Sequence, residues 1–187
     1  MIGAITAGLF SGAGAPASTT SYESIATITG SGTPSSITFS SIPSTYKHLQ
    51  VRLIARDSRA VTLEAYLIQF NGDTAANYSD HMLYGDGASA AAYSNVSASS
   101  MSAYAIPSAN ASASVYGAGI IDILDYANTS KYKTIRTSTG VDNNGSGVIS
   151  IGSGNWRSTS AVTSITIAAQ VGNWQANSSF ALYGIKG

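Results

Sequence analysis

Acidic side chains are the first candidates for chemistry in this sequence. Two carboxylates on opposite sides of a sugar make a glycoside hydrolase, and the candidates lie in or near strand-like segments: Glu64, Asp80, Asp86 and Asp122. Nothing in the sequence predicts that any two of them meet. The hydrolase elbow Gly-x-Ser-x-Gly and the phosphate loop that ends in Gly-Lys-Ser/Thr are both absent. We therefore expect that the protein is not an enzyme.

A metal site is not predicted either. Zinc needs three or four nitrogen, sulfur or oxygen ligands, and the chain has two histidines, His48 and His81, and no cysteine. The segment DNNGSG, which starts at Asp142, resembles the first half of a calcium-binding loop, but Ser153 stands where the bidentate glutamate belongs. We interpret DNNGSG as a tight turn and expect no cofactor.

The two tryptophans, Trp156 and Trp174, have two interpretations. Indole rings stack on sugars, which makes both residues candidates for glycan binding. Aromatic side chains also dominate protein cores and interfaces, so burial of both rings is the other interpretation.

The segments that must position these side chains are predicted to be strands. Residues 115–145 indicate one long hairpin, with a turn at 125–130 where Asp, Asn, Thr and Ser bond their own backbone. The second arm, 131–139, alternates as a strand with one wet face. The first arm is apolar on both faces: Ile121 and Ile123 point one way, and Tyr116, Ile120 and Leu124 the other. Such a strand is central in a covered sheet or packs against another subunit.

The remaining sequence also predicts strands. Residues 48–56 alternate, and residues 62–70 are apolar on both faces. The Ala/Ser-rich stretch 88–114 indicates a long loop or two weak strands. About ten short strands with turn signals between them, and no helical period, are typical of a β-sandwich or jelly roll. We expect an all-β, jelly-roll-like sandwich at residues 21–187.

Residues 1–20 are predicted to be an extended N-terminal arm, because five glycine or proline residues interrupt any regular helix. Its apolar residues need cover: Ile2, Ile5, Leu9 and Phe10. The arm lies along its own domain or is held by a neighbouring subunit, and we predict the second arrangement.

One basic cluster is predicted, around the strand at 48–56: Lys47, Arg52, Arg56 and Arg59. It is either a solvated outer face whose cations pair with carboxylates on adjacent strands, or a docking patch for an acidic protein surface. Both interpretations remain open at this stage.

The overall charge favours association with proteins. The net charge is zero and 10 % of the residues are charged, against about 25 % in an average soluble domain. A neutral Ser/Thr/Ala surface does little to prevent association. Together with the two strands that are apolar on both faces, this neutral surface predicts a homotrimer with a possible subunit interface at Tyr116, Ile120 and Leu124.

Neither nucleic acid nor a membrane is a predicted partner. The sequence has no run of basic residues that would bind nucleic acid, and no apolar run approaches the roughly 20 residues of a membrane span.

Several segments together carry a family resemblance: SYESIATITGSG, ITFSSIPSTYKHLQVRLIARDSRA, FNGDTAANYSDHMLYGDG, IIDILDYANTSKYKTIRTSTGVDNNGSG and the final SSFALYGIKG. They resemble virion structural proteins of tailed bacteriophages that infect aquatic bacteria, over about residues 21–187. The resemblance implies a β-sandwich that serves as a capsid cement (decoration) protein or as a tail component. Cement proteins of such phages are often jelly-roll trimers on the shell exterior.

These observations predict a non-enzymatic virion protein that stabilises a phage shell from the capsid exterior, with the major capsid protein and its own copies as partners. The alternative is a tail-associated or fibre-tip module that binds a host surface glycan. A third possibility, a coat protein that packages the genome, is weakened because the arm carries no basic residues.

Overall fold

The computed structural model describes residues 21–187, and that part of the chain consists of β-strands, turns and loops, with no helix that could cross a membrane. The predicted arm, residues 1–20, lies outside the described residues. In chain order the strands are β1 Tyr22–Thr29, β2 Ser36–Phe39, β3 His48–Ala55, β4 Leu63–Phe70, β5 Tyr78–Gly85, β6 Ala90–Ala98, β7 Met101–Pro107, β8 Gly117–Leu124, β9 Lys133–Asp142, β10 Gly147–Trp156, β11 Ile165–Ala169 and β12 Ser179–Ile185.

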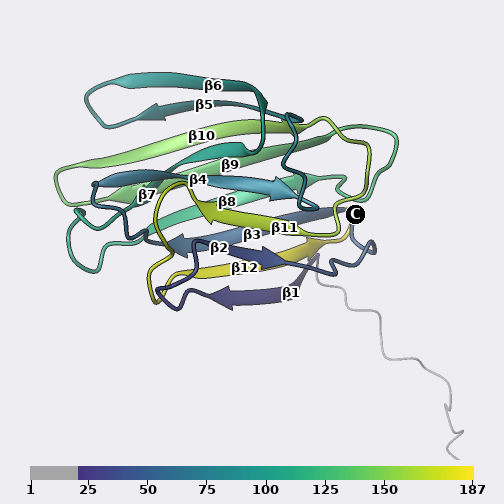
Figure 1. Cartoon of the computed structure of the whole chain (residues 1–187), viewed down its shortest axis with the longest axis horizontal. Helices are drawn as coiled ribbons and strands as arrows, with labels where there is room; N and C mark the ends of the chain where they lie inside the picture. Colours follow the sequence, from purple (N-terminus) through teal and green to yellow (C-terminus); the bar gives the residue numbers. More distant parts are fainter. Residues whose placement is uncertain (1–20) are drawn as a thin grey trace, which may run out of the picture.

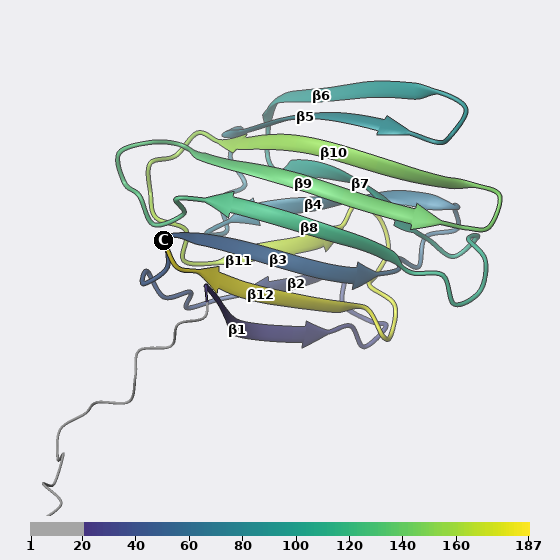
Figure 2. The ribbon, with the colours of Figure 1, turned by 180° about the vertical axis from the view of Figure 1, so that it is seen from behind.

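The strands form two antiparallel sheets. The larger sheet has eight strands in the order β1-β12-β3-β8-β9-β10-β5-β6, and the smaller has four in the order β2-β11-β4-β7. The chain passes repeatedly from one sheet to the other, and the two sheets lie face to face (Figures 1 and 2). This arrangement is a β-sandwich, and it confirms the all-β prediction.

The core lies between the two sheets because the strands alternate. In β3, Leu49, Val51 and Leu53 face inward and are buried, as the sequence predicted. The phenol of Tyr66 on β4 forms a 2.9 Å hydrogen bond with the hydroxyl of Thr139 on β9, which links the two sheets. The other large, fully buried apolar residues belong to the same core cluster: Trp174, Tyr78, Tyr126, Phe70, Phe180, Ile68, Met101, Ile106 and Ile121.

The predicted long hairpin is confirmed as β8–β9. Its turn bonds itself, since the Asn128 amide donates to the Asp125 carbonyl and the Ser130 amide donates to the Asn128 side chain. The stretch interpreted as a loop or two weak strands contains two strands, β6 and β7.

The larger sheet extends beyond the smaller one at the β5–β6 hairpin. The smaller sheet reaches across β9 and β10 with β7, its edge strand, whereas the β5–β6 hairpin lies at the far end of the molecule (Figures 1 and 2). All nine residues of β6 are exposed or partly exposed.

Candidate functional site

The outer face of the larger sheet carries two rows of mostly apolar side chains, interrupted on β9 by Ser138 and Gly140. The strand registers place Ile120, Ser138, Ile151, Leu83 and Ala92 side by side across β8, β9, β10, β5 and β6. A second row lies beside it and runs from Ile54 through Ala118 and Gly140 to Ile149. We call the exposed apolar residues of these rows the apolar band: Ile54, Leu83, Ala92, Ala118, Ile120, Ile149 and Ile151.

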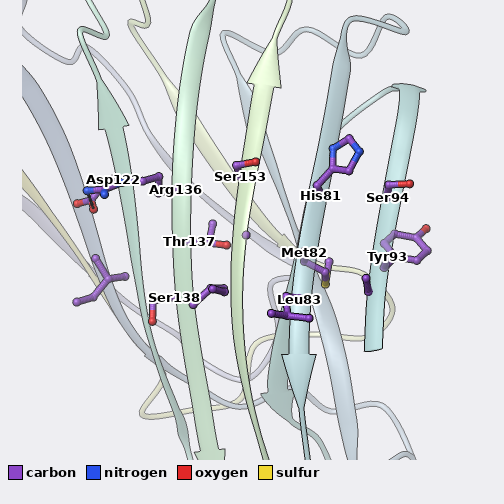
Figure 3. A pocket seen from close by; sticks show the side chains of 14 residues that line it. His81, Met82, Leu83, Tyr93, Ser94, Asp122, Arg136, Thr137, Ser138 and Ser153 are labelled. Carbon is purple, nitrogen blue, oxygen red and sulfur yellow. Dashed lines mark hydrogen bonds and ion pairs between the residues drawn. The ribbon is translucent and has the colours of Figure 1, made fainter. Parts of the chain in front are cut away.

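A polar row borders the apolar band. Asp122, Arg136, Ser153, His81 and Ser94 follow one another across the same five strands (Figure 3). The Arg136 guanidinium donates to the Asp122 carboxylate at 3.2 Å, and the Gln50 amide donates to the other carboxylate oxygen at 2.8 Å. Exposed ion pairs of this kind are worth less than about 1 kcal/mol. The polar row therefore contributes little to the stability of the sheet, and its side chains can form hydrogen bonds with a partner.

The first row and the polar row line a shallow hollow of about 860 Å³ on this face, and Ile54, Ala118 and Ile149 of the apolar band lie outside it. The side chains of Arg136, His81 and Ser94 border it (Figure 3). Within the described residues His81 makes no hydrogen bond to Ser94 or Ser153. These side chains therefore do not form a hydrogen-bonded pair of nucleophile and base. The hollow provides contacts for binding.

The local sequence of β10 explains why the apolar residues face outward. Ile149 and Ile151 are 65 % and 56 % exposed, whereas Ser150 between them is 3 % exposed. A shift of the strand by one residue would reverse these faces. The shift would move Ser153 or Asn155 to the position of Gly154, where a Cβ would lie 2.6 Å from the Met101 sulfur of β7. The inner face of β10 therefore requires glycine at this position, and the two isoleucines remain on the surface.

The four candidate carboxylates do not form a catalytic pair. Glu64 pairs with Arg59, and Asp122 pairs with Arg136. Asp86 accepts hydrogen bonds from the backbone of its own turn. Asp80 is buried on the inner face of β5, where burial raises the pKa of its carboxyl group. In residues 21–187 no three His, Cys, Asp or Glu side chains lie close enough together to hold a metal ion.

The prediction that Arg56 belongs to an exposed basic docking patch is wrong. This residue is 7 % exposed, and its guanidinium donates to four backbone carbonyls, those of Ala109, Ala111, Ser112 and Val115. It therefore anchors the 109–115 loop. The sequence could not show this, because the acceptors are backbone atoms more than fifty residues away.

The other three residues of the predicted patch lie apart from one another. Arg52 is on the outer face of β3 with its guanidinium over the rings of Tyr22 and Tyr183, at 5.5 and 5.2 Å from their centres. Arg59 pairs with Glu64 beside the smaller sheet. Lys47 lies 3.0 Å from Asp125 at the β8–β9 turn.

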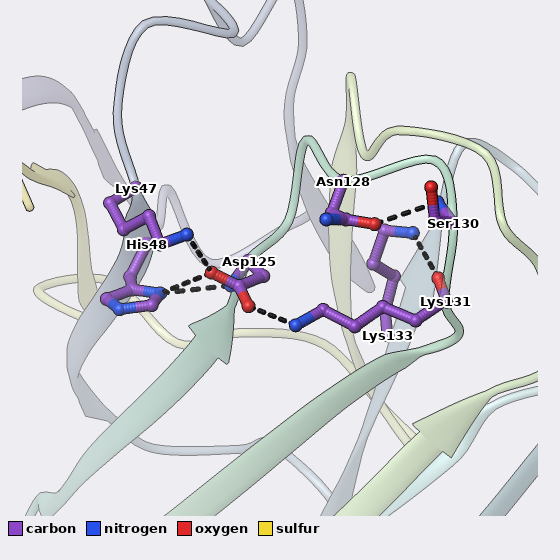
Figure 4. A network of polar contacts seen from close by, with 7 residues as sticks. All are labelled: Lys47, His48, Asp125, Asn128, Ser130, Lys131 and Lys133. Carbon is purple, nitrogen blue, oxygen red and sulfur yellow. Dashed lines mark hydrogen bonds and ion pairs between the residues drawn. The ribbon is translucent and has the colours of Figure 1, made fainter.

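The Lys47 ion pair belongs to a polar network at that turn (Figure 4). Asp125 binds Lys47 and Lys131, while its backbone amide donates to Nδ1 of His48 at 2.9 Å. The hydrogen bonds from Lys131 and Lys47 lower the pKa of Asp125 to about 2. Lys133 is buried beneath them, and its ammonium donates to the carbonyls of Lys131 and Thr159.

The proposed glycan-stacking role is wrong for both tryptophans, because both indoles are buried in the core. Trp156 donates to Asp73 at 2.7 Å and contacts Phe70 edge-on. Trp174 donates to the Ile167 carbonyl at 3.2 Å. Neither ring has a face free for a sugar.

The predicted interface residues lie outside the core. Ile120 belongs to the apolar band, and Leu124 is exposed at the end of the same face of β8. Tyr116 precedes the strand and donates to the Ala176 carbonyl at 2.7 Å. Sequence reasoning missed Leu83, Ile149 and Ile151, although the large-small alternation of the segment ISIGSG was a visible signal.

The chain was compared with known protein families, with curated proteins and with solved structures, and none of these comparisons finds a match.

Proposed function

We propose that the protein is a non-enzymatic structural protein that attaches to other protein subunits through the outer face of its larger sheet. The observation that carries the proposal is the apolar band. Its isoleucines and leucine are exposed on one face, on β3 and β8 and, beyond the small residues Ser138 and Gly140 of β9, on β10 and β5, where they contribute nothing to the core. Contiguous apolar surface on a soluble domain marks an interaction site. The polar row beside it supplies the bordering hydrogen bonds of a typical interface.

The strand order supports a jelly-roll fold with two inserted hairpins. If β5–β6 and β9–β10 are set aside, the other eight strands can be numbered in chain order. The larger sheet then has the order 1-8-3-6 and the smaller has 2-7-4-5. That order matches the one expected of the double Greek key of a jelly roll, a fold common in viral capsid and lectin domains. The inserted hairpins extend the first sheet, and they carry most of the apolar band.

The sequence resemblance supports a place in a phage virion. Together with the neutral surface, it favours a capsid cement protein on the shell exterior, with the major capsid protein and two further copies of this chain as partners. The fold alone decides no function, so the capsid role depends on the resemblance and on the exposed band together.

A tail-associated module that binds a host glycan is the second candidate, and the burial of both tryptophans removes the residues that favoured it. The hollow beside His81 and Arg136 offers a sugar polar partners. A glycan array probed with the full chain separates the two candidates, because a cement protein should bind no glycan.

Attachment to particles tests the capsid role. Phage particles that lack the protein are incubated with the purified chain, sedimented and heated. We expect many copies per particle and a higher temperature of genome release. The I149S/I151S variant should lose attachment, and Val171→Ser, which alters an exposed valine outside the band, should keep it. A dozen or fewer copies per particle would place the protein in the tail.

A further inference from the structure

The edge of β6 is open to another strand. β6 pairs with β5 on one side, and within residues 21–187 no backbone hydrogen bond reaches its other side. Residues 90–95 pair regularly with residues 80–85, so this stretch is a straight template. The sequence of β6, AAAYSNVSA, contains no charged residue and no proline.

The other three edge strands carry the features that block strand addition. β1 has a bulge and an ion pair between Glu23 and Lys186. β2 is four residues long. β7 has an irregular register with β4 and ends at Pro107. β6 also has an irregular register with β5, at residues 95–98, but its residues 90–95 are regular and carry no charge and no proline, so this stretch is the least protected of the described edges.

We propose that residues 2–10 of a neighbouring copy of this chain bind to the free edge of β6 as an added strand. The segment IGAITAGLF has nine residues, as β6 does, and it contains no charge and no proline. In an extended conformation Ile5 and Leu9 point to one face, and Ile2 and Phe10 to the other.

Both faces at the β6 edge suit such a strand. On the outer face, Ala92 and Leu83 continue the apolar band up to the edge. On the inner face, a hollow of about 340 Å³ beneath the hairpin is lined by Tyr84, Tyr93 and Tyr104, among others. An arm with large apolar residues on both faces would cover both.

The positions of the two edges favour a neighbouring copy over the same copy. Residue 21 leads into β1, which is the opposite edge of the sheet that ends in β6. Eight strands span seven spacings of about 4.8 Å, or roughly 34 Å. The twelve residues from Phe10 to Tyr22 span at most about 40 Å, so pairing within one copy requires almost complete extension. In a ring where the β1 edge of one copy faces the β6 edge of the next, the arm crosses about one strand spacing.

Such a contact is heterologous, and it closes into a ring of identical copies when the rotation between neighbours closes. A ring of three copies would be the predicted homotrimer. The inference concerns the isolated protein and does not depend on the proposed attachment to a shell, so each proposal is testable without the other.

A disulfide trap between two populations of the full chain tests the arm contact. The natural sequence has no cysteine, so introduced thiols react only with each other. Copies with a single cysteine at position 5, 7 or 9 are mixed with Ala92→Cys copies and oxidised mildly. We expect a disulfide-linked pair of unlike chains from at least one mixture. Mixtures with Thr38→Cys, on the exposed face of β2, should give none.

Two outcomes of the trap would overturn the proposal. Linkage to Thr38→Cys as efficient as linkage to Ala92→Cys means random collision. A dimer of Ala92→Cys copies that forms faster than any mixed pair means that β6 pairs with β6 of another copy.

The molecular mass in solution provides the second test. Light scattering should give a multiple of the 19.1 kDa chain for the natural protein and for Thr38→Lys. The chain without residues 2–10 and the A92K/S94K variant should both be monomers, since lysine on an edge strand prevents strand addition. A natural protein that is monomeric, or a truncated chain with the same mass as the natural one, would refute the arm contact.

Discussion

Strands β3 and β10 belong to the same sheet but differ in which of their residues are buried. β3 buries Leu49 and Val51 and leaves Arg52 exposed, as a strand with one wet face should. β10 buries Ser150 and exposes its two isoleucines, Ile149 and Ile151. Isoleucines that point away from the core contribute little hydrophobic free energy to folding. Their place on the surface is therefore best explained by a partner.

The difference follows from what covers each strand. The inner face of β3 faces the core between the sheets, and its Leu and Val side chains fill that space. The inner face of β10 lies against β7 so closely that Met101 leaves no room for a side chain at Gly154. In its middle, β10 therefore has small residues on the inner face and isoleucines on the outer face, whereas Trp156 at its end is buried in the core.

Replacing Trp174 should cost the most stability. The indole is fully buried and packs edge-on against Phe180 at 5.0 Å, between the two sheets. We expect Trp174→Ala to lower the free energy of unfolding by about 3–5 kcal/mol, measured by urea unfolding. A loss below about 1 kcal/mol would mean that the ring is not a core residue, and would reopen its role in glycan binding.

Replacing Arg56 should cost slightly less. Removing the guanidinium leaves four backbone carbonyls without their charged donor. Hydrogen bonds to charged groups contribute about 1.5–3 kcal/mol, so Arg56→Met should destabilise the protein by about 2–4 kcal/mol. Arg136→Met, on the exposed outer face, is the matched control and should change stability by less than about 0.5 kcal/mol. Equal losses in the two variants would contradict the distinction between a structural and a surface arginine.

Acidity should weaken the β8–β9 turn in a defined range of pH. The pKa of Asp125 lies at about 2 in the folded protein and near 3.8 when the chain is unfolded. The lowered pKa means that its contribution to stability is complete above about pH 4. It is lost as the pH falls towards 2. Asp125→Asn should therefore cost about 1 kcal/mol at pH 7, and the difference from the natural protein should vanish near pH 2. A constant difference down to that pH would show that the effect is not electrostatic.

Features of the fold that depend on neighbouring residues could be predicted from the sequence, whereas features that depend on contacts distant in sequence could not. The β8–β9 hairpin followed from local signals, because the DYANTS turn and the alternation of the second arm lie within a few residues. The predicted roles of Arg56 and Trp156 were wrong because their partners are distant in sequence. The alternation in β10 was visible, but which face is inside depends on Met101 of β7. The alternation of side chains along a sequence shows that a segment is a strand, but it does not show which face of the strand is buried.

Replacing the exposed isoleucines of β10 should have the smallest effect on folding and a large effect on assembly. Because Ile149 and Ile151 are already in contact with water, the I149S/I151S variant should change the free energy of unfolding by less than about 0.5 kcal/mol per site. The matched variant is Ile121→Ser, which makes the same chemical change on the inner face of β8, where the side chain is fully buried.

Ile121→Ser should cost about 2–4 kcal/mol, because it removes buried methyl groups and places a hydroxyl in the core. Urea unfolding measures both variants, and sedimentation with phage particles measures attachment of the folded I149S/I151S protein. If I149S/I151S unfolds as readily as Ile121→Ser, the two isoleucines belong to the folding core and the apolar band is no docking surface. If it remains stable and attaches as the natural protein does, the partner binds elsewhere, and the unusual pattern of β10 serves another purpose.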